Sequence, residues 1–179
     1  MKTVKSALWN VIRRRKADEK SLRDILSEIP IFEGLNLKEL EFVSRILHQR
    51  KYAPKELIFK EAEAGNGMYI IKSGFVSIYS EEHDTEFVKL QDGQFFGELS
   101  LVDGSPRSAS AKAVGDCVLF GFFKPDLIQV LEKNPKIGIK VLFNLSRVLS
   151  ERLRHTNQQY IQIQTELQQL QQAAAEVGE

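Results

Sequence analysis

Residues 94–113 carry side chains whose types and order fit recognition of a small anion that also bears hydroxyl groups. Gly97 lets the backbone approach a ligand closely, and the run that follows it, residues 98–101, can open a short helix whose free N–H groups attract phosphate. Arg107 adds a planar, charged guanidinium that binds phosphate in bidentate fashion. Glu98 would repel phosphate, so we expect it to accept hydrogen bonds from a sugar hydroxyl. Together these residues predict a site for a small nucleotide.

The same segment resembles the phosphate-binding cassette of the cyclic nucleotide-binding domain family, whose pattern is roughly F-G-E-L-(A/S)-L, a short spacer and P-R-(A/S/T)-A. The fixed positions of this pattern are filled here by Phe96, Gly97, Glu98, Leu99, Leu101, Pro106, Arg107 and Ala109. The resemblance covers about residues 26–156. It implies that Arg107 holds the cyclic phosphate, that Glu98 holds the ribose 2′-hydroxyl, and that Ser108 and the backbone at residues 97 and 99 complete the contacts.

The resemblance predicts a ligand-binding set drawn from the cassette and from the C-terminal part of the chain. Its members are Phe96, Gly97, Glu98, Leu99, Ser100, Pro106, Arg107, Ser108, Ala109, Thr156 and Asn157. The alternative is that Arg107 and Glu98 form an ion pair that only holds a loop, as an isolated acid and arginine commonly do. Members of the family that bind no nucleotide exist, so a nucleotide-free scaffold stands beside the sensor hypothesis.

The overall composition is that of a folded chain with no large electrostatic field. The chain has 179 residues, a formal net charge of +1 and a hydrophobic share of 42%, which allows one domain with appendages. Cys117 is the single cysteine, so no intrachain disulfide can form and a reducing compartment fits. The sequence has neither an apolar run of membrane-spanning length nor a signal peptide. We therefore expect a cytoplasmic protein.

Residues with catalytic or metal-binding potential are sparse and scattered. His48, His83 and His155 lie far apart in the sequence with no ligand spacing, and Cys117 sits in an apolar run without an activating base nearby. We expect no enzyme activity, no metal site and no cofactor other than the nucleotide ligand.

The middle of the chain has the pattern of an antiparallel β structure. Short apolar segments at 57–59, 68–71, 75–79 and 87–90 are separated by glycine-rich or polar turns, which predicts a barrel or sandwich. The resemblance specifies a jelly roll with N-terminal helices and the cassette inserted in it. Ala62 and Ala64 depart from the glycine and proline usual in the family's loop. We place this domain, with its helical entry, at residues 21–135.

Residues 1–20 predict a short amphipathic helix rich in lysine and arginine. Such a helix can touch an anionic membrane surface. Because its apolar face is small, we favour packing against this domain or a dimer mate.

Residues 136–179 predict a long helix with a heptad pattern. One series with seven-residue spacing is Leu142, Leu149, Thr156, Ile163 and Leu170, and the other is Ser146, Leu153, Tyr160, Leu167 and Ala174. We expect a parallel homodimer through this helix. The alternative is a single helix that packs on its own barrel in its first half and frays beyond Thr165.

Thr156 and Asn157 interrupt the apolar seam of this helix with polar groups. The segment resembles the catabolite-activator members of the family, in which a Thr-Ser pair on the dimer helix meets the adenine. This implies contacts from Thr156 and Asn157 to the base, one from each subunit. Polar residues that only set coiled-coil register are the equally weighted alternative.

The functional hypothesis from the sequence is a sensor module for a cyclic nucleotide, with cAMP favoured over cGMP. Ligand binding in the cassette would be relayed through the C-terminal helix to an effector protein that the sequence does not identify. Direct DNA binding is not expected, because no helix-turn-helix segment follows the long helix in this sequence.

Overall fold

In the computed structural model of the protein, residues 21–177 are described, with side chains over residues 21–172. Two four-stranded antiparallel sheets form the body of the domain, with strand orders β1-β8-β3-β6 and β2-β7-β4-β5. The strands are β1 (His48–Tyr52), β2 (Leu57–Phe59), β3 (Gly67–Ser73), β4 (Phe75–Ser80), β5 (Thr85–Gln91), β6 (Phe95–Phe96), β7 (Ser110–Ala113) and β8 (Cys117–Phe123). The predicted antiparallel jelly roll with flanking helices is confirmed.

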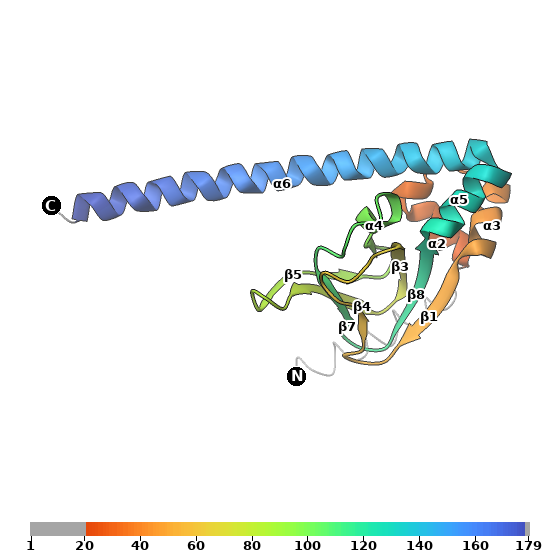
Figure 1. The fold of residues 1–179 in the computed structure, drawn as a ribbon, viewed down its shortest axis with the longest axis horizontal. Coiled ribbons are helices and arrows are strands. Elements are labelled where there is room, and N and C mark those ends of the chain that lie inside the picture. Colours follow the sequence, from red (N-terminus) through yellow and green to blue (C-terminus); the bar gives the residue numbers. More distant parts are fainter. Residues whose placement is uncertain (1–20, 178–179) are drawn as a thin grey trace, which may run out of the picture.

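Helices gather at one end of the sheets, and one of them is very long (Figure 1). They are α2 (Leu22–Glu28), the 3₁₀ turn η1 (Pro30–Phe32), α3 (Leu37–Ile46), the single-turn α4 (Leu99–Val102), α5 (Lys124–Lys133) and α6 (Pro135–Val177). A large core joins these helices to strand β3 and the end of β8, while a smaller core lies between the two sheets. The cassette connects the two sheets, since β6 pairs with β3 and β7 pairs with β4.

The expected N-terminal helices are confirmed as α2 and α3, and each begins at a capping box. Ser21 accepts a hydrogen bond from the backbone N–H of Asp24, whose carboxylate accepts one from Ser21 in return. Asn36 and Glu39 make the same reciprocal pair at the start of α3. Each box satisfies backbone donors that a helix start leaves free.

Strand β1 was not expected from the sequence. Its residues His48 to Lys51 are all exposed, so they lack the alternation of apolar and polar side chains that identifies a half-buried strand. It exists because its backbone pairs in register with the apolar strand β8, from His48 opposite Gly121 to Tyr52 opposite Cys117.

Helix α6 buries side chains against its own domain only in its first part, up to Val148 within the described residues. Ile137, Val141, Leu145 and Val148 are buried against the N-terminal helices and α5. From residue 151 to 172 every side chain is exposed. Figure 1 shows this second part of α6 running past the sheets as an uncovered helix. The helix continues to Val177, so the helical fraying considered beyond Thr165 is not observed.

Polar contacts hold the start of α6 on the N-terminal helices. The Asn144 amide donates to the backbone oxygens of Ile31 (3.2 Å) and Glu33 (2.8 Å). The Lys140 ammonium donates to both carboxylate oxygens of Glu39 at 2.9 Å. Because these bonds join segments about a hundred residues apart, they fix the direction in which α6 leaves the domain.

The Lys140–Glu39 pair gives the domain a measurable acid sensitivity. The hydrogen bond from Lys140, followed by that from the Asn36 N–H, holds the pKa of Glu39 below its ordinary 4.5. A lowered folded-state pKa contributes stability that is present above pH 4.5 and is lost as pH falls below it. We expect Lys140→Met to lower the unfolding free energy near pH 7 but to change it little near pH 3. Urea unfolding at both pH values measures this, and an equal loss at both would contradict it.

Two further findings concern the described part of the chain. None of its helices is long and apolar enough to cross a membrane, and no cluster of metal-ligating side chains occurs within residues 21–172. The basic helix predicted over residues 1–20 lies outside the described residues.

Candidate functional site

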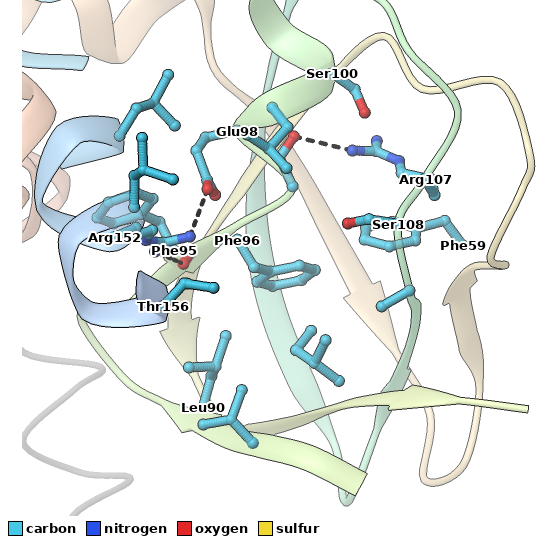
Figure 2. A pocket seen from close by; sticks show the side chains of 17 residues that line it. Phe59, Leu90, Phe95, Phe96, Glu98, Ser100, Arg107, Ser108, Arg152 and Thr156 are labelled. Atoms are coloured by element: carbon cyan, nitrogen blue, oxygen red, sulfur yellow. Dashed lines mark hydrogen bonds and ion pairs between the residues drawn. The ribbon is translucent and has the colours of Figure 1, made fainter. Parts of the chain in front are cut away.

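A cavity of about 630 Å³ lies between the second sheet, the cassette and α6. Figure 2 shows Arg107 and Glu98 entering it from opposite sides, with Phe96 between them and Thr156 on the α6 side. The predicted residues that line it are Phe96, Gly97, Glu98, Leu99, Ser100, Arg107, Ser108, Ala109 and Thr156. Within the described part of the chain, Pro106 and Asn157 are not among the lining residues.

Arg107 enters the cavity from the segment before β7 and is only 6% exposed. Its Nη1 donates to the backbone oxygens of Gly67 (2.7 Å) and Gly97 (3.0 Å). Its Nε is buried and has no hydrogen-bond partner within the part of the chain that the structure describes. Burial lowers the pKa of the Arg107 guanidinium, with Tyr69 and Glu98 acting in the opposite direction, but an arginine remains charged at neutral pH. The cavity therefore contains a fixed positive charge with an unused donor.

The backbone at Gly97 makes this position of Arg107 possible. Gly97 has a φ of +77°, and a Cβ at this residue would come within 2.6 Å of the Arg107 Nη1. A larger residue would therefore be strained and would also displace the guanidinium. The sequence predicts that the Gly97 backbone lies close to a ligand. In the structure, the group that lies close to this backbone is the Arg107 guanidinium.

Glu98 is only 3% exposed, and its two carboxylate oxygens have different surroundings. Oε1 accepts a hydrogen bond from Nη1 of Arg152 at 2.5 Å, while Oε2 is buried and has no partner among residues 21–172. Glu98 thus forms its ion pair with α6 and not with Arg107, so the loop-holding pair considered from the sequence is not observed. An unpaired buried acceptor is costly, and a ligand hydroxyl would satisfy it.

Arg152 is a site residue that the sequence reasoning missed. It lies on α6 one turn before Thr156, donates from Nη2 to the Phe95 carbonyl (3.3 Å) and places its guanidinium over the Phe95 ring at 4.9 Å. The available signal was its spacing, since residues four apart share one helix face. Without the fold, however, nothing indicates that this face meets Glu98.

The short helix predicted after Gly97 is observed as α4, which is only one turn long. A single turn has little macrodipole. What α4 can offer a ligand is therefore the free N–H groups at its start. Ser100 is buried in α4, and a Cβ on Gly65 would come within 2.2 Å of its hydroxyl oxygen. Gly65 is therefore needed for the cassette to pack, a role that the sequence did not reveal.

The backbones of Pro106 and Arg107 pair with the loop after β2. The Arg107 N–H donates to the Glu63 oxygen and its own oxygen accepts from the Ala62 N–H, both at 2.9 Å. Pro106 forms an antiparallel bridge with Ala64. Ala62 itself has a φ of +65°, which explains the glycine usual in the family at this position. Pro106 therefore helps to hold the backbone that carries Arg107, and within the described chain it is not one of the residues that line the cavity.

We expect Ala62→Gly to raise stability. A left-handed conformation costs an L-residue roughly 1–2 kcal/mol, and glycine removes this cost. The greater flexibility of glycine in the unfolded chain lowers stability by about 0.4–1 kcal/mol. The net gain in unfolding free energy is therefore up to about 1.6 kcal/mol, measurable by urea unfolding. Ala53→Gly, at an exposed position without positive φ, is the matched control and should lose stability. Equal losses in both variants would contradict the assignment of strain to Ala62.

Comparison with known proteins agrees with this architecture. Residues 49–134 match the family described as the cyclic nucleotide-binding domain. The chain is 30% identical over 131 residues to the cyclic AMP receptor protein of Thermus thermophilus, covering 72% of this chain and 59% of that protein. It is 35% identical over 117 residues to the type II regulatory subunit of cAMP-dependent protein kinase from Drosophila melanogaster, covering 64% of this chain and 30% of that subunit.

A solved structure gives the same result. The crystal structure of a cyclic nucleotide-binding domain from Methylobacillus flagellatus superposes with a TM-score of 0.68 at 25% identity, covering 79% of this chain and 80% of that one. The chain therefore carries a domain of the cyclic nucleotide-binding domain family. It spans 59% of the length of the Thermus receptor and 30% of the Drosophila subunit.

Proposed function

We propose that the chain is a sensor for a cyclic nucleotide, with cAMP as the preferred ligand. One observation carries the proposal. Two buried polar atoms of opposite character, the donor Nε of Arg107 and the acceptor Oε2 of Glu98, have no partner among the described residues, and both residues line the same cavity. Buried polar atoms are nearly always paired in native proteins. A ligand with a phosphate oxygen for the first and a hydroxyl for the second would satisfy both, which is the chemistry of a ribose cyclic phosphate.

The charges that line the cavity favour a cyclic diester over a linear monophosphate. Among the described lining residues the charged side chains are Glu98, Arg107 and Arg152, which sum to +1. Arg152 is already paired with Glu98, so one uncompensated cation, Arg107, faces the ligand. A cyclic phosphodiester carries one negative charge and is matched. A phosphate monoester at neutral pH carries close to two, and the second would be buried without a partner.

The base would lie on the apolar side of the cavity. Ile78, Val88 and Leu90 from the second sheet and Leu153 from α6 line that side, with the Thr156 hydroxyl at its edge. The polar group at Thr156 and the likeness of this segment to catabolite-activator members support adenine over guanine. A hydroxyl on Ser108 would also serve a guanine amino group, so the preference for cAMP is the part of the proposal that needs a direct test.

Calorimetry and thermal unfolding with cAMP, cGMP, AMP and adenosine test the proposal. We expect cAMP to bind most tightly, AMP at least tenfold more weakly, and adenosine more weakly than cAMP because it has no phosphate. At a hundredfold excess over its dissociation constant, cAMP should stabilise the fold by about 2.7 kcal/mol. The absence of any shift with either cyclic nucleotide would overturn the proposal in favour of the nucleotide-free scaffold. Tighter binding of cGMP would overturn only the preference for adenine.

The relay through α6 would begin at Arg152. A ligand that engages Glu98 through Oε2 favours the position in which Oε1 holds Arg152, so binding and the position of α6 become coupled. We expect cAMP to slow amide hydrogen exchange over residues 150–160 of the unaltered chain, and Arg152→Gln to abolish this slowing. The exposed neighbour Arg154 provides the matched control, Arg154→Gln. Equal ligand protection of α6 in both variants would exclude Arg152 as the link.

The partners of α6 in this proposal are a second copy of the chain and an effector protein. In a parallel pair in register, heptad position g of one helix lies beside position e of the other, five residues further along. Arg152 and Asn157 occupy these positions. Asn157 does not line the cavity of its own chain. In this dimer, Asn157 of the partner subunit would reach that cavity instead. This supports the expected base contacts from both subunits.

A further inference from the structure

Phe59 lies directly against the cation of the site, although no sequence pattern singled it out. The ring of Phe59, at the end of β2, lies 4.1 Å from the central carbon of the Arg107 guanidinium. Figure 2 shows it on the same side of the cavity as Arg107 and Ser108. A guanidinium over an aromatic face is attracted by the negative potential of the ring.

The ring is itself held in place from two directions. Its centroid lies 5.7 Å from that of Phe96 and 6.0 Å from that of Tyr69, both in tilted arrangements. The strand that carries it is fixed by pairing with β7, where Phe59 lies opposite Ala111. Because β7 begins three residues after Arg107, the strand pairing places the ring and the guanidinium on adjacent segments of one sheet.

The guanidinium is thereby restrained in two independent ways. The two carbonyls of Gly67 and Gly97 hold Nη1, which fixes one corner of the planar group. The planar group could still rotate about that corner. The Phe59 ring, whose centroid lies 4.1 Å from the guanidinium carbon, occupies the space beside the group and limits this rotation, so it restricts the directions in which Nε and Nη2 present their protons.

We infer that Phe59 is a positioning residue, which orients the Arg107 guanidinium so that it meets one particular exocyclic oxygen of a cyclic phosphate. This inference rests on the proposed function and names a determinant of its phosphate recognition. It predicts stereoselectivity, because a fixed donor distinguishes the two exocyclic oxygens on phosphorus, whereas a freely rotating one accepts either.

The test uses cAMP and the two phosphorothioate diastereomers of cAMP, Sp and Rp, each with sulfur in place of one exocyclic oxygen. We expect the unaltered chain to bind one diastereomer at least tenfold more tightly than the other. Phe59→Met, which keeps apolar bulk without a ring, should weaken cAMP binding by about three- to tenfold and reduce the ratio between diastereomers by a similar factor. Phe59→Tyr, which keeps the ring, should retain both the affinity and the ratio.

The outcomes separate positioning from a merely structural role. Thermal unfolding identifies any variant that is not folded at the assay temperature, and Phe59→Tyr then provides the folded comparison. Equal weakening of both diastereomers by Phe59→Met, with the ratio unchanged, would overturn the inference and leave Phe59 as a packing residue. An unchanged affinity would overturn it as well. A lack of cAMP binding by the unaltered chain would instead refute the proposed function, and the inference with it.

Discussion

Replacing Arg107 with alanine is expected to weaken cAMP binding by roughly thirty-fold to several-thousand-fold. In the proposed site the guanidinium is the cation that faces the ligand, and it is almost fully buried at 6% exposure. Removing one partner of a buried, hydrogen-bonded charge pair costs about 2–5 kcal/mol, and each 1.4 kcal/mol is a tenfold change in affinity. Without Arg107 the phosphate would also lie near Glu98 with no cation of its own, since Arg152 is bound to that carboxylate.

Arg107→Lys should recover only part of this affinity. Lysine keeps the positive charge, but it cannot bond two backbone oxygens with one nitrogen while presenting others to phosphate in the same plane. Calorimetry gives the dissociation constants, and thermal unfolding checks the fold, since Gly67 and Gly97 lose a donor in both variants. The exposed Arg45, which pairs with Glu41 on its own helix, supplies the control Arg45→Ala. If Arg107→Ala bound cAMP as tightly as Arg45→Ala, the assignment of the phosphate to Arg107 would be wrong.

The predicted site residues that the structure brings to one cavity are mostly those that form a short contiguous pattern in the sequence. Glycine, glutamate and arginine of the cassette are at most ten residues apart, and the structure brings Gly97, Glu98 and Arg107 to one cavity. Helix caps such as Ser21 are equally local. In these cases the chemistry of each residue type and its spacing were enough.

The residues that the sequence did not locate depend on contacts between distant segments. Arg152 meets Glu98 across 54 residues, and Phe59 meets Arg107 across two paired strands. Gly138 is a further case, because a Cβ there would come within 2.6 Å of the Leu131 side chain, so it sets how closely α5 and α6 approach. No local periodicity encodes such pairings, and only the register of strands and the packing of helices reveal them.

The exposed half of α6 leads to the second large prediction, which concerns the oligomeric state. Leu153, Tyr160, Ile163, Leu167 and Leu170 are between 47% and 69% exposed, and they recur at the a and d positions of the heptad. A stripe of large apolar side chains on an uncovered helix is typical of a binding surface. We therefore expect the chain to be a dimer in solution, with the two α6 helices parallel.

The double variant Ile163→Lys, Leu167→Lys is expected to convert this dimer to a monomer. Burying a Leu or Ile side chain fully contributes roughly 1.5–3 kcal/mol, and about half of each is still exposed in the single chain. Four such side chains per dimer therefore contribute at least about 3 kcal/mol, or more than a hundredfold in the dimerisation constant, before repulsion between the lysines is counted. Both positions lie beyond the cavity-lining Thr156, so the residues that this chain itself contributes to the ligand site are unaltered.

Sedimentation equilibrium over a range of concentrations measures the change. The matched control is Gln158→Lys, Thr165→Lys, which adds the same charge to the opposite face of the same helix and should leave the dimer intact. If both double variants were equally monomeric, charge on α6 rather than the apolar stripe would be responsible. If Ile163→Lys, Leu167→Lys remained dimeric, the stripe would not be the interface. In a monomer that keeps its fold, cAMP should also bind more weakly, because Asn157 of the partner subunit can then no longer reach the base.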